Sequence, residues 1–138
     1  MKDASLSLVL MHGPQDSSGV PFLFVGSKES SQSLKELQDN QITHILICAK
    51  FFKPSFDGQF EYKQLDMVDK PDFNIAKCVQ QGIEFIQECK KTENGRVLLH
   101  CSLGKSRACT MAIAYVMQEL GIGYDEAFEH VKARRPCC

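Results

Sequence analysis

Apolar residues along the chain follow two spacings, which predict strands in some segments and helices in others. Leu6, Leu8 and Leu10 alternate with Ser5, Ser7 and Val9, short apolar runs recur at 22–25, 42–49 and 97–99, and 60–65 is a further strand-like segment. These segments predict β-strands. The strands at 6–10 and 22–25 predict a hairpin, whose wide loop holds the turn residues between His12 and Gly19. Helical spacing of apolar residues predicts helices over 73–92, 107–120 and from 124 to before Pro136.

Two further features refine this pattern. A helix is predicted from Ser27, as its N-cap, to Asp39. The segment after Arg107 is apolar almost all round, so its helix should be central, whereas the last helix should bury Tyr124, Ala127, Phe128 and Val131. The alternation of strands and helices predicts an α/β fold, with a mixed, mostly parallel sheet of about five strands flanked by helices.

Composition limits the class of protein and its partners. A chain of 138 residues suits one domain, 1–138, and a formal charge of −1 gives no reason to expect nucleic acid as a partner. Seven cysteines without a signal-peptide pattern favour a reducing compartment. We therefore expect the cytoplasm, with the nucleus as an alternative. No Cys-x-x-Cys metal spacing is present, and the sequence does not indicate an oligomeric state.

The segment from Val97 to Arg107 carries the candidate chemistry. An apolar run stops at Cys101, passes through a short loop containing Gly104, and reaches Arg107 at the start of an apolar helix. Loop amides and a helix N-terminus bind anions, and the guanidinium of an arginine can hold two phosphate oxygens. The same positive surroundings should stabilise a thiolate at Cys101. A thiolate that faces a bound phosphoryl group is a nucleophile, which indicates phosphatase chemistry.

The motif His100-Cys101-x-x-Gly104-x-x-Arg107 resembles the signature of the cysteine-based protein phosphatases, and the surrounding chain resembles their dual-specificity branch. Phe24-Val25-Gly26-Ser27 is also similar to that family's first strand and helix. The resemblance implies that Cys101 attacks phosphorus without a metal or cofactor, while His100 orients the loop. It further implies a phosphate site formed by Ser102, Leu103, Gly104, Lys105, Ser106 and Arg107.

Phosphoryl transfer to a thiolate also needs a general acid for the leaving oxygen. Three aspartates, Asp66, Asp69 and Asp72, lie in the loop before the predicted helix at 73–92. The family places its acid shortly before such a Phe-Asn-Ile helix start, so Asp69 matches best, and Asp66 is the second candidate. Asp72 stands where a helix N-cap belongs. His44, within a predicted central strand, is expected to be a half-buried structural histidine.

The chain departs from the family pattern in two places. The family usually has serine or threonine directly after the arginine, where its hydroxyl assists release of the thiolate, and here that residue is Ala108. Hydrolysis of the phosphoenzyme should therefore be slow relative to its formation. Relatives also continue past the Arg-Pro pair with a further helix, whereas this sequence ends at Cys137-Cys138. Membrane attachment is expected only if those cysteines are lipidated.

Cys48 and the substrate class complete the expectations. Cys48 lies late in a central strand, and some relatives use a cysteine there to bond the oxidised nucleophile; the alternative is a small buried apolar residue. Without a sequence segment to deepen the pocket, phosphotyrosine and phosphoserine or phosphothreonine in proteins are the expected substrates. Lys105 leaves a phosphoinositide phosphatase as one alternative, and Ala108 leaves a phosphoprotein-binding module with little turnover as another.

Overall fold

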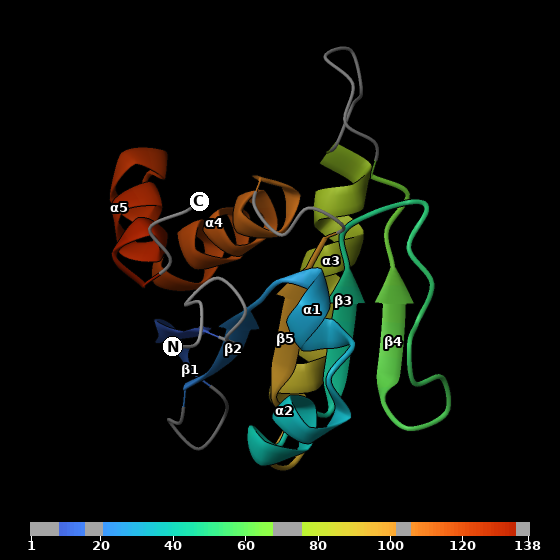
Figure 1. Cartoon of the computed structure of the whole chain (residues 1–138). Coiled ribbons are helices and arrows are strands. Elements are labelled where there is room, and N and C mark those ends of the chain that lie inside the picture. Colours follow the sequence, from blue (N-terminus) through green and yellow to red (C-terminus); the bar gives the residue numbers. More distant parts are fainter. Residues whose placement is uncertain (1–8, 16–20, 68–75, 102–105, 135–138) are drawn as a thin grey trace.

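A five-stranded sheet forms the centre of the molecule (Figure 1). The computed structural model describes residues 9–15, 21–67, 76–101 and 106–134. The strands are β1 (Val9–Gln15), β2 (Pro21–Val25), β3 (His44–Ile47), β4 (Glu61–Gln64) and β5 (Val97–His100), in the order β1-β2-β5-β3-β4. β1 is antiparallel to β2, and β2, β5, β3 and β4 are parallel. The predicted mixed, mostly parallel sheet is confirmed.

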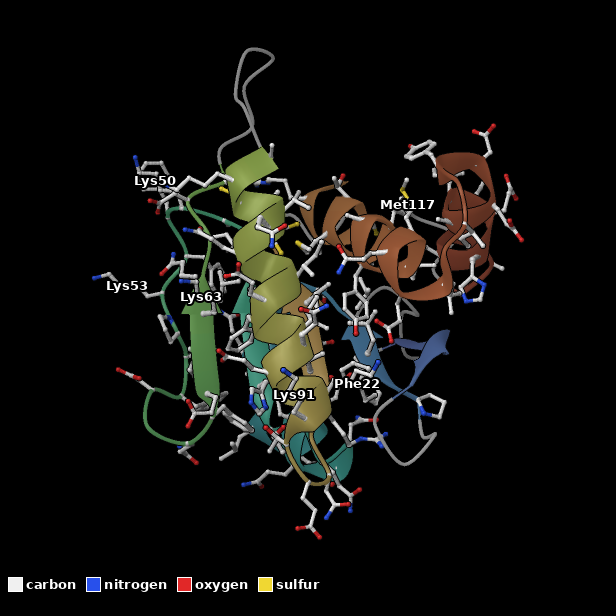
Figure 2. All side chains as sticks on the ribbon, turned by 180° about the vertical axis from the view of Figure 1, so that it is seen from behind. Phe22, Lys50, Lys53, Lys63, Lys91 and Met117 are labelled. Carbon is white, nitrogen blue, oxygen red and sulfur yellow. The ribbon has the colours of Figure 1, made fainter. Side chains whose placement is uncertain are left out.

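Helices cover both faces of this sheet. They are α1 (Lys28–Ser31), α2 (Leu34–Asp39), α3 (Ala76–Lys91), α4 (Ser106–Leu120) and α5 (Tyr124–Arg134). In Figures 1 and 2, α1 and α2 lie on one face, and α3, α4 and α5 lie on the other. Among the described residues, no helix is both long and apolar enough to cross a membrane.

The helix predicted over 27–39 is two short helices. Ser27 caps α1 as predicted, because its side-chain oxygen accepts a hydrogen bond from the Ser30 amide at 3.3 Å. Ser33 then caps α2 by accepting from the Glu36 amide, also at 3.3 Å. A second N-cap oxygen inside the segment starts a new helix and thereby ends the first.

The N-terminal hairpin corrects the predicted turn. Residues 12–15, expected as part of the loop, belong to β1, which pairs with β2 from Val9 to Gln15. The register shifts between Met11 and Gln15, so the pairing is irregular where Gly13 and Pro14 occur. A bulge on an edge strand tolerates both residues, because neither has to complete a regular ladder there.

The core forms where β2, β5 and β3 meet α4. All four residues of β3 and of β5 are buried, as expected for parallel strands with both faces covered. α4 is buried along most of its length, which confirms its predicted central place. The prediction for α5 is partly wrong: Ala127 and Val131 are fully buried, but Tyr124 is 57% exposed and stacks on Phe128 at a ring distance of 6.0 Å.

Candidate active site

Cys101 lies at the carboxyl end of the sheet, directly after the central strand β5. Its residue is 1% exposed, and β5 has β2 on one side and β3 on the other. α4 begins at Ser106, so the end of β5 and the start of the helix are separated only by residues 101–105. Ligands of parallel α/β sheets bind at this edge, where the loops leave the strands.

The predicted phosphate site is described only in part. Ser102, Leu103, Gly104 and Lys105 lie outside the described residues, and Ser106 is the first residue of α4. Their role in binding phosphate stays a prediction from the motif. On the described flanks, Cys101 directly follows the last residue of β5, and α4 starts five residues after Cys101, which is the order that the motif requires.

Arg107 is held by a backbone carbonyl. Its Nη1 atom donates a hydrogen bond to the Met67 oxygen at 3.3 Å, and the same oxygen accepts a hydrogen bond from the Lys50 amide at 3.0 Å. Met67 therefore joins three segments: the start of α4, the chain after β3, and the chain after β4. Since Arg107 is half-buried and anchored, its guanidinium is oriented before a ligand binds.

The segment that leads to the predicted general acid departs from beside Arg107. Met67 is buried next to that guanidinium, and Asp66 is exposed. Asp69 and Asp72 lie outside the described residues, so the choice of Asp69 as the acid and of Asp72 as a cap stays a prediction. Asp66, the second candidate, is on a described part of the same segment and makes no hydrogen bond among the described residues.

His100 is a buried neutral imidazole beside the nucleophile. It is 1% exposed, and burial lowers its pKa to about 4. The ring of Phe52 meets the imidazole edge-on, with ring centroids 4.9 Å apart. At neutral pH the imidazole carries no charge and is a weak base. This agrees with the expected orienting role and argues against a role as general base.

Cys48 lies opposite Cys101 on the neighbouring strand. The parallel register pairs Ile47 with His100, and the Cys48 amide donates to the His100 oxygen at 2.8 Å. The next residues of the two strands are therefore neighbours, about 4.8 Å apart between backbones. Both cysteines are buried and unbonded. Burial raises the pKa of the Cys48 thiol, and a charge on Cys101 raises it further.

Comparison with known proteins agrees with this arrangement. Residues 23–138 match the family model described as "Dual specificity phosphatase, catalytic domain". The chain belongs to this family. It is 37% identical over 114 residues to dual specificity protein phosphatase 1 of Arabidopsis thaliana, covering 83% of this chain and 57% of the relative.

Two further relatives carry a different kind of name. Serine/threonine/tyrosine-interacting protein B of Xenopus laevis is 40% identical over 125 residues, covering 86% of this chain and 56% of the relative. The crystal structure of the human tyrosine phosphatase-like serine/threonine/tyrosine-interacting protein superposes with a TM-score of 0.76 at 38% identity, covering 83% of this chain and 80% of that one. The chain thus spans about half the length of the curated relatives that it matches.

Ala108 is the residue of the site that differs from the serine or threonine that the family usually has at this position. It follows Arg107 in the first turn of α4 and is fully buried. An alanine has no hydroxyl to donate, so it offers nothing to a sulfur that leaves phosphorus. His44, by contrast, is held as a structural residue but is buried and not half-buried as expected: its Nδ1 atom lies 2.7 Å from the Thr43 hydroxyl, and its ring packs on Phe85.

Sequence reasoning missed the residues that support the site through backbone atoms. The Gln64 side-chain amide donates to the carbonyl oxygens of Ala49 and Lys50 at 2.9 Å each, and to that of Phe52 at 2.5 Å. These bonds fix the segment that places Phe52 against His100. A carbonyl acceptor such as the Met67 oxygen has no side-chain signature, and a single glutamine has little, so neither could be found from the sequence.

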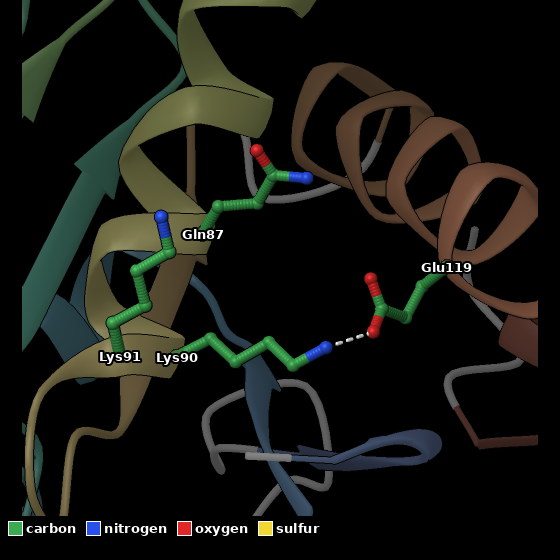
Figure 3. A pocket seen from close by; sticks show the side chains of 4 residues that line it. All are labelled: Gln87, Lys90, Lys91 and Glu119. Atoms are coloured by element: carbon green, nitrogen blue, oxygen red, sulfur yellow. Dashed lines mark hydrogen bonds and ion pairs between the residues drawn. The ribbon is translucent and has the colours of Figure 1, made fainter. Parts of the chain in front are cut away.

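A separate polar pocket lies between α3 and α4 (Figure 3). Gln87, Lys90 and Lys91 line it from α3 and Glu119 lines it from α4, and Lys90 pairs with Glu119 across it. All four residues lie in the C-terminal halves of their helices, whereas the site is at the N-terminal start of α4. The pocket is therefore not part of the candidate active site. No cluster of metal-ligating side chains occurs in the described part of the chain.

Proposed function

We propose that this protein hydrolyses phosphotyrosine and phosphoserine or phosphothreonine in proteins. The observation that carries the proposal is the pair of Cys101 at the end of β5 and Arg107 at the start of α4, in a chain of the dual-specificity phosphatase family. The anchored guanidinium and the short connection between the two elements suit an oxyanion of a phosphate monoester. The general reaction is the one that the family catalyses, and we assign its reacting groups to residues of this chain.

In the first step the Cys101 thiolate attacks phosphorus. A sulfur–phosphorus bond forms while the bond from phosphorus to the substrate oxygen breaks, and Asp69 gives its proton to that oxygen. Arg107 and the backbone amides after Cys101 stabilise the charge on the remaining phosphate oxygens. In the second step water attacks the cysteinyl phosphate, Asp69 takes a proton from that water, and the Cys101 thiolate leaves with inorganic phosphate as the product.

His100 supports this chemistry without taking the proton. Its pKa of about 4 keeps the imidazole neutral at physiological pH, so it is a poor acceptor for the thiol proton. Its buried, packed ring fixes the end of β5 and therefore the position of Cys101. We assign it a positioning role.

A second function has specific support: binding of phosphoproteins with little turnover. Two relatives at 38–40% identity are called serine/threonine/tyrosine-interacting proteins, one of them phosphatase-like. Ala108 removes the hydroxyl that the family uses in the second step, which would leave phosphate on Cys101. The presence of Cys101, Arg107 and Asp69 favours catalysis over this alternative.

Hydrolysis of paired phosphopeptides tests the proposal. Phosphotyrosine and phosphothreonine versions of one peptide should both release phosphate, and Cys101→Ser should abolish release from both. Asp69→Asn should slow the reaction most for leaving groups of high pKa, because they need the proton. Tight phosphopeptide binding without phosphate release by the unmutated protein would instead support the binding module.

A further inference from the structure

The chain between β3 and β4 presents an exposed aromatic side chain beside the active site. Phe51 is 87% exposed, whereas its neighbour Phe52 turns inward and packs on His100. Of the described residues, the other exposed large apolar ones are Leu120 at 38% and Tyr124 at 57%. Both of these lie at the C-terminal end of α4 and the start of α5, away from the carboxyl end of the sheet.

This exposure is imposed by a fixed backbone. The Lys50 amide donates to the Met67 oxygen at 3.0 Å, and Gln64 binds the carbonyl oxygens of residues 49, 50 and 52. The backbone on both sides of Phe51 is therefore held in place. A partner that covers the Phe51 ring gains hydrophobic contact and has little loop ordering to oppose it.

The same segment lies next to the phosphate-binding arginine. The Met67 oxygen accepts hydrogen bonds from both the Lys50 amide and the Arg107 guanidinium, so the two donors are at most two hydrogen-bond lengths apart. An extended peptide advances about 3.3 Å per residue. With its phosphate on Arg107, the residues within about three positions of the phosphorylated one would reach Phe51.

The charge around Phe51 is positive on the described surface. Lys50 and Lys53 are both exposed, and Figure 2 shows their side chains extending away from the sheet on the β4 side of the molecule. The Lys50 ammonium lies 5.6 Å from the centre of the Phe51 ring. Neither lysine takes part in an ion pair with another described residue. Asp66 is the exposed acidic residue next to Met67 and opposes this charge in part.

We propose that Lys50, Phe51 and Lys53 form a recognition surface for phosphopeptides that carry apolar and acidic residues within about three positions of the phosphorylated residue. The inference rests on the proposed function, since it assumes that the phosphate lies on Arg107. The Phe51 ring contacts the apolar residue, and the two ammonium groups attract the acidic ones. Such a surface selects among phosphoproteins while the chemistry at Cys101 stays the same.

Binding by the Cys101→Ser protein tests this surface without requiring turnover. Fluorescent phosphotyrosine peptides with glutamate and leucine flanks, with glutamine and serine flanks, and with lysine flanks would be titrated and followed by polarisation. The glutamate–leucine peptide should bind about tenfold more tightly than the lysine peptide, which corresponds to about 1.4 kcal/mol. That preference should decrease with ionic strength, because the lysines are exposed to solvent.

Matched variants locate the effect. In the Cys101→Ser background, Phe51→Ala should weaken the glutamate–leucine peptide about tenfold, and Lys50→Gln with Lys53→Gln should weaken it severalfold. Tyr124→Ala and Lys91→Gln change an exposed aromatic residue and an exposed lysine elsewhere, and should leave the affinities as they were. Equal affinity for the three peptides, or equal effects of Phe51→Ala and Tyr124→Ala, would overturn the proposal.

Two further results separate this surface from other outcomes. Sedimentation with phosphatidylserine vesicles that is lost in Phe51→Ala, together with no peptide preference, would identify a membrane contact and overturn the proposal. Absence of hydrolysis by the protein with Cys101 intact would contradict the proposed function. In that case, the peptide preference of the Cys101→Ser protein would still show whether Lys50, Phe51 and Lys53 form a recognition surface.

Discussion

Oxidation should join Cys48 to Cys101. The two residues are neighbours on adjacent parallel strands, at a backbone separation of about 4.8 Å, and disulfides span Cα distances of about 4.4–6.8 Å. Peroxide converts a thiolate to a sulfenic acid. The Cys48 thiol then attacks that sulfur, a disulfide forms, and the sulfenic oxygen leaves as water. We expect this reaction because both cysteines are free and buried, and each directly follows a residue of the paired positions Ile47 and His100.

The size of the effect follows from the loop that the bond closes. A crosslink between positions 48 and 101 closes about 54 residues, for which the chain-entropy model gives about 4 kcal/mol of stabilisation as an upper limit. For a chain of 138 residues this limit corresponds to an increase in melting temperature of about 15 °C. Strain in the native state reduces the increase, so a measured shift of about 5–15 °C fits the geometry.

Mass spectrometry of tryptic peptides after peroxide treatment is the assay, with thermal unfolding as a second readout. A linked Cys48–Cys101 peptide should appear, and dithiothreitol should remove it together with the gain in melting temperature. Cys48→Ser should abolish both. Cys78 is the matched control, because it is buried and its charge also acts on Cys48. Cys78→Ser should keep the linked Cys48–Cys101 peptide. A Cys48–Cys78 link in the unmutated protein, with no Cys48–Cys101 link, would contradict the prediction.

Three other predictions test single residues. Burial lowers the pKa of His100 from 6.5 to about 4, so the unfolded chain takes up a proton at a higher pH than the folded chain does. The free energy of unfolding should therefore fall by about 3 kcal/mol as the pH drops from 6.5 to 4. Denaturant titrations should show a smaller loss for His100→Gln, and the same pH profile for both proteins would contradict this. Gly95→Ala should destabilise the protein by about 1–3 kcal/mol, because the added Cβ would overlap the Cys89 carbonyl. Gly123→Ala should not, because there is open space around Gly123. Equal urea midpoints for the two variants would contradict the close contact at Gly95. Ala108→Ser should speed release of phosphate from Cys101, which rapid-quench kinetics would detect as a smaller burst relative to steady turnover; unchanged turnover would remove the role assigned to the missing hydroxyl.

The sheet could be predicted because parallel strands covered on both faces must be apolar throughout. The apolar runs that form β2, β3 and β5 are buried on both faces of the sheet, so their continuous apolar composition indicates central strands. The hairpin turn was misplaced because an irregular edge strand accepts glycine and proline, which a sequence pattern assigns to loops. The division into α1 and α2 could have been predicted, because Ser33 and Glu36 have the spacing of a capping box, which indicates a helix start.

The site divides in the same way. Cys101 and Arg107 could be proposed because their side-chain types and spacing carry the chemistry. Cys48 could be proposed because it lies late in a predicted central strand, where some relatives have a cysteine, and the structure places it next to Cys101. Met67 acts through its carbonyl and Gln64 through bonds to other carbonyls, so their residue types do not reveal them. Phe51 could not be distinguished from a core aromatic, because two adjacent phenylalanines point in opposite directions only once the backbone is fixed.

Trapping phosphate on the protein tests most directly whether Cys101 is the nucleophile of a phosphatase. A phosphopeptide with a radiolabelled phosphate would be mixed with the protein and quenched in acid within milliseconds to seconds. We expect label on the tryptic peptide that contains Cys101, persisting longer than in Ala108→Ser and absent from Cys101→Ser. Release of phosphate by Cys101→Ser at the rate of the unmutated protein, or labelling of another residue, would contradict it.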